Sequence, residues 1–264
     1  MSQAPFGDLV GRFMRARLER TPFAVPEEIR QGLPLPDAFQ LQGQHECEVL
    51  SNYGGEVTGF KLGGTDMKAL AAMGMPGPLR GPIFSAFTHS SPARLRRRDF
   101  FVCAVEAEIA VRVGKDIGGQ PCLLEREELL AAIDGVMPAI EIADSRYSDY
   151  ATAPATAILA DAGFAGAFVP GAEAIQWKSI DLVSLPVRLR VNGSEVRTGT
   201  GGRVMGDPLQ ALNLLVQDLG RVGRKLRAGQ VVSTGACTPP YLAQAGDDIE
   251  ADFGVLGLVK LRLE

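Results

Sequence analysis

The stretch VEAEIAV, residues 105–111, places two glutamates two positions apart within an apolar run. In a β-strand, residues two apart project from the same face, so Glu106 and Glu108 point side by side. Neighbouring carboxylates repel each other, and apolar surroundings raise the cost of removing them from water. We therefore expect a positive charge between them, and a divalent cation is the simplest candidate. Ligation by oxygen alone favours Mg²⁺, Mn²⁺ or Ca²⁺ over zinc.

A second apolar stretch, MPAIEIAD at residues 137–144, contains a third carboxylate. The E-x-E pattern alone is also typical of an exposed strand whose glutamates face water. Glu141, however, stands between two isoleucines, where a carboxylate needs a partner. Three such acids, two of them on one strand, can occupy one face of an octahedral metal and leave the other positions open for water and substrate.

The secondary structure predicted for the rest of the chain changes from helices to strands along its length. The first third reads as short helices, the third of them with Asp37 as its N-cap. The predicted strands are residues 57–62, 100–113, 136–143, 185–191, 194–198, 229–233 and 255–263. Asn192-Gly193 is the strongest hairpin signal, and Asp207-Pro208 opens a helix with aspartate as N-cap. Many strands, few helices and many glycine turns predict an α+β fold with a mixed, mostly antiparallel β-roll core.

We expect two parts that form one continuous structural unit. Residues 1–72 are predicted to be a smaller N-terminal helical or α/β part, and residues 73–264 the metal-binding catalytic core. No composition shift in the first third is strong enough to mark an independent domain.

Charge and composition narrow the class of partner. The 264 residues include 31 acidic and 27 basic side chains, a formal net charge of −4, which argues against nucleic acid as the main partner. Residues 1–20 lack the apolar segment of a signal peptide, and residues 151–172 are too broken by proline, aspartate and glycine to span a bilayer. The four cysteines are scattered, as is typical of reduced thiols. We expect a cytoplasmic protein without a membrane segment.

Several short motifs occur in a characteristic order. They are GFKLG at 59–63, EAE at 106–108, PAIEIADSR at 138–146, VNG at 191–193, GDPL at 206–209 and the run at 229–235. Together they resemble the 2-oxopent-4-enoate hydratase branch of the fumarylacetoacetate hydrolase superfamily, over essentially the whole chain. The resemblance implies a rolled β core, Mg²⁺ or Mn²⁺ as cofactor, and a homo-oligomer. It also implies a small 2-oxo or 2-hydroxydienoic acid from aromatic meta-cleavage as substrate.

The resemblance assigns roles to particular residues. The implied metal ligands are Glu106, Glu108 and Glu141. Lys61 matches the active-site lysine, which would pair with the substrate carboxylate and relay a proton. Thr234 is assigned to substrate binding.

The sequence departs from the family pattern where polar residues are usual. The departing positions are Leu79, Ala162 and Ala236. Arg80 follows directly after Leu79. It is predicted to bind a second substrate carboxylate, unless it faces solvent.

We expect a lyase that adds water to a 2-hydroxydienoate or 2-oxo-enoate and yields a 4-hydroxy-2-oxo acid. The first alternative is a 4-oxalocrotonate-type decarboxylase, which the sequence does not separate from a hydratase. The second is an acylpyruvate-type C–C hydrolase. It is disfavoured because such enzymes generally have a histidine shortly before E-x-E, and this chain has Ala104 at that position. The third is a protein that binds a metal or 2-oxo acid without turning it over.

Overall fold

The computed structural model describes residues 8–264 except 67–69 and 72–73. Its helices are α1 (Leu9–Glu19), α2 (Glu27–Gly32), α3 (Leu35–Tyr53), α5 (Arg126–Leu130), α6 (Ala155–Ala160) and α7 (Pro208–Arg221). Its strands are β1 (Val57–Gly63), β2 (Leu79–Phe84), β3 (Ala93–Leu95), β4 (Ala104–Val113), β5 (Ile117–Gly118), β6 (Ile133–Ala143), β7 (Ala165–Pro170), β8 (Pro186–Val191), β9 (Ser194–Thr200), β10 (Lys225–Leu226), β11 (Val231–Ala236), β12 (Tyr241–Leu242), β13 (Asp248–Asp252) and β14 (Leu258–Leu263).

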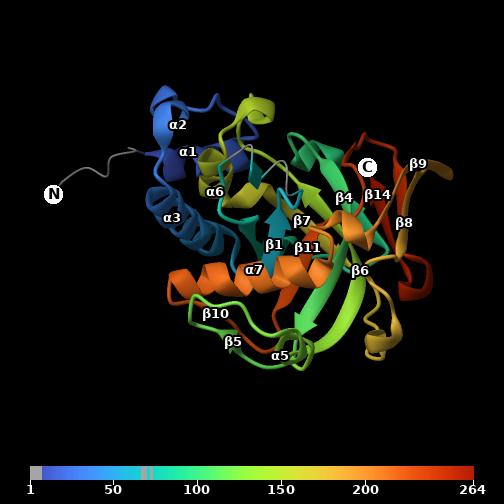
Figure 1. Ribbon diagram of the computed structural model, residues 1–264. Helices are drawn as coiled ribbons and strands as arrows, with labels where there is room; N and C mark the ends of the chain where they lie inside the picture. The colour runs from blue at the N-terminus through green and yellow to red at the C-terminus, as the bar shows by residue number, and fades with distance from the viewer. Residues whose placement is uncertain (1–7, 67–69, 72–73) are drawn as a thin grey trace.

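The strands form two main sheets, seen side by side in Figure 1. Within the described residues, the larger sheet has the order β2-β1-β11-β4-β6-β7 with β12 paired to β4, and the smaller has the order β3-β14-β13-β8-β9. Among the strand pairs of these sheets in the described part of the chain, only β1–β11 and β14–β3 are parallel. The largest buried apolar cluster draws side chains from both sheets, among them Ile109, Leu189 and Val259. The mostly antiparallel β-roll predicted from the sequence is therefore confirmed.

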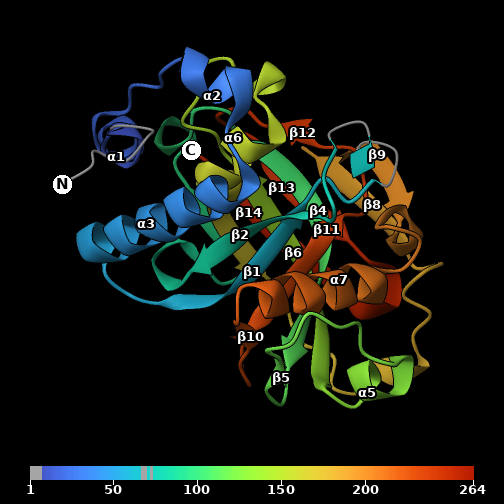
Figure 2. The same ribbon diagram turned by 60° about the vertical axis from the view of Figure 1, so that its left-hand side comes forward.

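Helix α7 packs against β11 on the face of the larger sheet that also meets the smaller sheet, and its apolar side chains join the main buried cluster (Figure 2). Asp207 caps it as predicted, because its side chain accepts a hydrogen bond from the Leu209 amide. Leu212 and Leu215 are fully buried on the face that packs against the strands. None of the helices in the described residues is long and apolar enough to cross a bilayer.

Helices α1 to α3 pack together with α6 at one end of the roll (Figure 1). Their apolar cluster includes Phe13 and Leu41 from the N-terminal helices and Leu159 from α6. The N-terminal helices therefore share a core with a segment from the middle of the chain. The proposed boundary between residues 72 and 73 lies outside the described residues, and the two-part division remains a prediction.

Several predicted element boundaries differ from the structure, and two of the differences have a clear local reason. Helix α3 begins at Leu35, with Pro34 and not Asp37 in the N-cap position, because Pro36 fits the first turn, where its missing N–H is not needed. Strand β4 begins at Ala104 and not at residue 100. The guanidinium of Arg97 donates hydrogen bonds to the carbonyls of residues 100–102, and Cys103 has a φ of 55°, so the segment before Ala104 is held in a loop.

Candidate metal centre

Two paired strands bring three glutamates together. Glu106 on β4 lies directly opposite Glu141 on β6 in the antiparallel register, and Glu108 lies two residues further along β4 on the same face. Each of the three offers a carboxylate oxygen, and these oxygens all lie within 4.8 Å of one another. Glu108 and Glu141 are buried, whereas Glu106 is partly exposed. The cluster therefore has one side that opens toward solvent.

Strand β11 orients Glu108. The Ser233 hydroxyl donates to Glu108 Oε2 at 2.6 Å, and the Gly235 amide donates to the same oxygen at 3.1 Å. The Gly235 amide reaches this position because the β4–β11 register shifts after Ser233, and Gly235 adopts a φ of 122°. The other oxygen, Glu108 Oε1, is buried without a hydrogen-bond partner. This arrangement leaves one oxygen of Glu108 available to a ligand.

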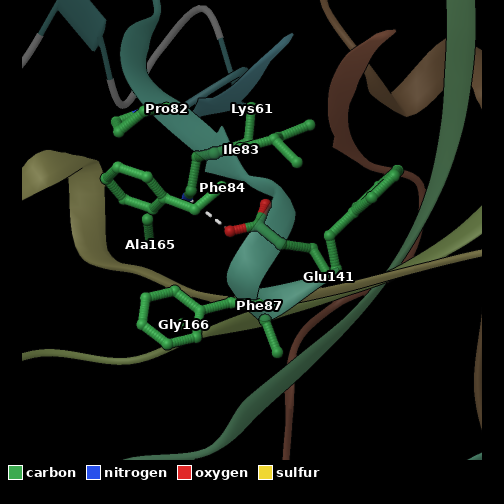
Figure 3. Close-up of a pocket in the computed structure, with 10 residues that line it drawn as sticks. Lys61, Pro82, Ile83, Phe84, Phe87, Glu141, Ala165 and Gly166 are labelled. Carbon is green, nitrogen blue, oxygen red and sulfur yellow. Dashed lines mark ion pairs between the residues drawn. The ribbon is translucent and has the colours of Figure 1, made fainter. Parts of the chain in front are cut away.

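Strand β1 supplies a positive charge to the same cluster. Lys61 Nζ lies 2.7 Å from Glu141 Oε1, and both side chains are no more than 5% exposed. Figure 3 shows the carboxylate of Glu141 turned toward Lys61 among the rings of Phe84 and Phe87. The second oxygen, Glu141 Oε2, is buried and has no hydrogen-bond partner. Lys61 therefore satisfies one oxygen of Glu141 and leaves the other unpaired.

The charges of the cluster do not balance within the described residues. Burial, followed by the charge of Glu141, raises the pKa of Glu106 to about 7, and the same two causes raise the pKa of Glu108 well above its usual range. Burial alone would lower the pKa of Lys61, but the attraction of Glu141 and Glu106 outweighs it, and the net shift is upward.

These residues fit a divalent cation. When all three carboxylates are ionised, one ammonium leaves a deficit of two positive charges, and the unpartnered oxygens of Glu108 and Glu141 lie within the same cluster. Carboxylate oxygens are the ligands that Mg²⁺, Mn²⁺ and Ca²⁺ prefer. The three glutamates would hold the ion, and Lys61 would remain beside it.

The structure places the other two predicted site residues elsewhere. Arg80 on β2 stands next to Gly81, the residue opposite Lys61, so its side chain projects from the other face of the strand. Its guanidinium pairs with Asp218 on α7 at 2.9 Å and stacks over the Phe39 ring. The hydroxyl of Thr234 is fully buried and donates to the Ile109 carbonyl at 2.8 Å. Neither side chain joins the glutamate cluster.

The partly exposed side of the cluster opens into a cavity of about 160 Å³. Its lining includes Glu106 from the cluster, Thr65 and Asp66 from the loop after β1, and Arg203 and Pro240 from the loops beyond β9 and β11. We call this cavity the mouth of the site. On the other side of Lys61 and Glu141, a cavity of about 20 Å³ lies against Phe84 and Phe168. It holds about one water molecule, so of these two cavities in the described residues the mouth is the one with room for an organic ligand.

Sequence reasoning missed two residues of this region. Ser233 lies in a buried strand, where a hydroxyl needs a partner, and that burial was the only available signal. Arg203 follows the run GTGG at residues 199–202, which reads as an ordinary turn. Nothing local in the sequence shows that this turn lies against the loop after β1.

Comparison with known proteins agrees with this geometry. Residues 49–264, which include the three glutamates and Lys61, match the family described as fumarylacetoacetate (FAA) hydrolase, C-terminal. The chain belongs to this family.

Named relatives of this chain include hydratases and decarboxylases. A 2-keto-4-pentenoate hydratase of Paraburkholderia xenovorans is 29% identical over 92% of this chain and 89% of its own. A 4-oxalocrotonate decarboxylase of Pseudomonas putida is 29% identical over 86% of this chain and 84% of its own. A solved structure of 4-oxalocrotonate decarboxylase from Pseudomonas putida G7, complexed with magnesium and adipate, superposes with a TM-score of 0.89, 27% identity and coverage of 97% of this chain and 96% of that chain. The sequence resemblance to this family is confirmed.

Proposed function

We propose that the protein is a metal-dependent lyase for small 2-hydroxydienoic or 2-oxo-enoic acids, and that it adds water to give a 4-hydroxy-2-oxo acid. The observation that carries this proposal is the buried Lys61 beside three convergent carboxylates with two unpartnered oxygens. Membership of the fumarylacetoacetate hydrolase family supports it, as do relatives named as hydratases.

A divalent cation held by Glu106, Glu108 and Glu141 would act as a Lewis acid toward the carboxylate and carbonyl oxygens of a 2-oxo acid. Lys61 contributes through its position. An ammonium has three N–H donors, and Glu141 accepts from one of them at 2.7 Å. The remaining donors can bind the substrate carboxylate and hold a proton beside the reacting carbons.

The surroundings of Lys61 restrict where water can reach. Phe84 and Phe168 close the cluster on one side, and the mouth beside Glu106 is the wide approach. Solvent therefore meets the substrate from the mouth, and the same opening lets a product leave.

Decarboxylation is the second candidate. The superposition with a 4-oxalocrotonate decarboxylase at a TM-score of 0.89 favours it specifically. The 2-oxo acid end of the substrate, polarised at the metal site, would accept electron density during hydration. It would do the same during the loss of CO₂ from a substrate that carries a suitably placed second carboxylate.

The finer points of the proposal are the ion, the assembly, the pathway and the location. We propose Mg²⁺ or Mn²⁺, because the donor set is all carboxylate oxygen. We propose a homo-oligomer, and gel filtration with light scattering measures it directly. The substrates named for the relatives support a role in aromatic catabolism. A cytoplasmic location is consistent with four free cysteines.

The proposal is tested by product analysis. The Mg²⁺-loaded protein is incubated with 2-hydroxypenta-2,4-dienoate and, separately, with 4-oxalocrotonate, and products are identified by NMR. A 4-hydroxy-2-oxo acid supports the hydratase, and release of CO₂ from the dicarboxylate supports the decarboxylase. Pyruvate with a second acid, or no turnover of either compound, would contradict both. Glu108→Gln serves as the metal-site control.

A further inference from the structure

We propose that Arg203 binds a second carboxylate of the substrate at the mouth of the site and so selects dicarboxylic substrates. This inference rests on the proposed function, because it takes the 2-oxo acid end of the substrate to lie at the glutamate cluster. It assigns to Arg203 the recognition that the sequence had suggested for Arg80.

The backbone around Arg203 is fixed against the loop that forms the opposite rim of the mouth. Arg203 ends the short 3-10 helix Gly201–Arg203, and two residues later the Met205 amide donates to the Thr65 carbonyl at 3.0 Å. A Cβ on Gly201 would lie 1.9 Å from the Leu182 carbonyl oxygen, so this turn also lies tightly against the chain before β8. The position of Arg203 is therefore set by the fold although its side chain is exposed.

The guanidinium of Arg203 is available to a ligand. Across the part of the chain that the structure describes, Arg203 forms neither an ion pair nor a side-chain hydrogen bond. It lies close enough to Glu106 to attract that carboxylate electrostatically. Arg80, in contrast, is paired with Asp218 and buried. Of these two arginines, Arg203 is the one that a substrate can reach.

The lining of the mouth also suits the carbon chain between two carboxylates. Besides Glu106 and Arg203 it includes the apolar side chains of Leu62, Ala236 and Pro240, which suit the carbons of a diene. The cavity behind Lys61 holds about 20 Å³ and cannot accept a tail, whereas the mouth holds about 160 Å³. A tail that leaves the cluster therefore passes toward Arg203. A carboxylate at its end can form two parallel hydrogen bonds with the guanidinium.

The test measures binding and not turnover, so it does not depend on which reaction the protein catalyses. The Mg²⁺-loaded protein is titrated calorimetrically with 2-oxoadipate and with 2-oxohexanoate, which have the same chain length and differ in the terminal carboxylate. We expect tighter binding of 2-oxoadipate by about 10- to 100-fold, and we expect Arg203→Leu to abolish the difference without weakening 2-oxohexanoate. Arg203→Lys should retain part of it. Arg98→Leu, which changes another exposed arginine, is the matched control and should retain all of it.

Equal affinities for the two compounds in the unmodified protein would overturn the proposal, as would no binding of either or an unchanged preference in Arg203→Leu. The proposed function fails separately. If 2-oxoadipate is preferred through Arg203 but neither dienoate is turned over, the recognition site stands and the lyase assignment falls. If dienoates are turned over without any dependence on Arg203, the lyase assignment stands and this inference falls.

Discussion

Lys61 Nζ lies 2.7 Å from Glu141 Oε1, and the two buried side chains come from strands that are not neighbours in the sheet, because β11 and β4 lie between β1 and β6. One ammonium is thereby placed beside three carboxylates. It neutralises a single charge and leaves room for a divalent cation. The relationship explains why the sheet tolerates three acids in an apolar region, and it leads to the first two predictions.

Glu108→Gln should remove metal binding and leave the fold intact. The amide oxygen can still accept from Ser233 and Gly235, but one ligand charge is lost and the repulsion within the cluster falls. We expect the affinity for Mg²⁺ and Mn²⁺ to fall by about 100-fold or more, measured by calorimetric titration. The melting temperature in EDTA should stay equal to that of the unmodified protein or rise. Unchanged metal affinity would contradict the assignment of Glu108 as a ligand.

Lys61→Met should separate turnover from metal binding. Turnover of the dienoate should fall by about 100-fold or more, because a charge that stabilises the substrate carboxylate is lost. Metal affinity should remain or increase, because the cluster loses its only positive neighbour at ion-pair distance within the described residues. Lys225→Met, which removes a partly exposed lysine paired with Asp116, is the control and should change neither quantity. Full dienoate turnover by Lys61→Met would show that Lys61 has only a structural role.

The sequence predicted those features that depend on local periodicity. The two-residue repeat was enough to place Glu106 and Glu108 on one face, because that property belongs to a single strand. The register that sets Glu141 opposite Glu106 depends on the whole β4–β6 pairing, and only the isoleucines around Glu141 hinted at it. Arg80 was expected near the substrate, but strand alternation gives that face to Gly81. Arg203 lies in a turn without periodicity, and its place depends on a contact with a loop more than a hundred residues earlier.

Gly59→Ala should damage the site from a distance. Gly59 pairs with Val231 in the parallel β1–β11 register, and an added Cβ would lie 1.8 Å from the Val231 carbonyl oxygen. The carbonyl oxygen belongs to the backbone and the Cβ is fixed to its own Cα, so neither can turn aside and the strands must separate. These strands carry Lys61 and Ser233 two residues further on. We expect a loss of about 3 kcal/mol or more in the free energy of unfolding, with weaker metal binding. Gly43→Ala in α3, where nothing lies within 4 Å of the added carbon, is the control and should be neutral or slightly stabilising.

The pair Arg80–Asp218 should behave as a structural ion pair. Arg80→Met should cost about 2–4 kcal/mol of unfolding free energy, because Asp218, which is 20% exposed, loses its partner. Arg80→Met combined with Asp218→Leu should cost less than the sum of the two single changes, measured by urea unfolding. The relative binding of mono- and dicarboxylic 2-oxo acids should be the same in Arg80→Met as in the unmodified protein. If Arg80→Met lost the preference for dicarboxylic 2-oxo acids, Arg80 would have to be assigned to substrate binding.

His45 should make the protein sensitive to mild acid. The imidazole is fully buried, stacks on Phe13 with ring centroids 4.7 Å apart, and has no partner for Nε2. Burial, followed by the charges of Arg17 and Arg146, lowers the pKa of His45 well below 6.5. Below pH 6.5, His45 binds a proton in the unfolded chain but stays neutral in the folded protein, so the free energy of unfolding falls as the pH falls. For one such group the loss between pH 6.5 and 5.5 is about 1 kcal/mol.

His45→Phe isolates this effect, because phenylalanine keeps the stacking on Phe13 and cannot titrate. The nearby Asp161 acts in the opposite sense, since burial raises its pKa to about 6 and the folded state gains a proton there as the pH falls. Asp161 is present in both proteins, so the difference between their stabilities reports His45 alone. Urea unfolding at pH 7.5, 6.5 and 5.5 in EDTA should show His45→Phe gaining about 1 kcal/mol relative to the unmodified protein over the lower interval. His89→Phe, at a half-buried histidine, should show a smaller gain, and parallel pH curves for His45→Phe and the unmodified protein would refute the role of His45.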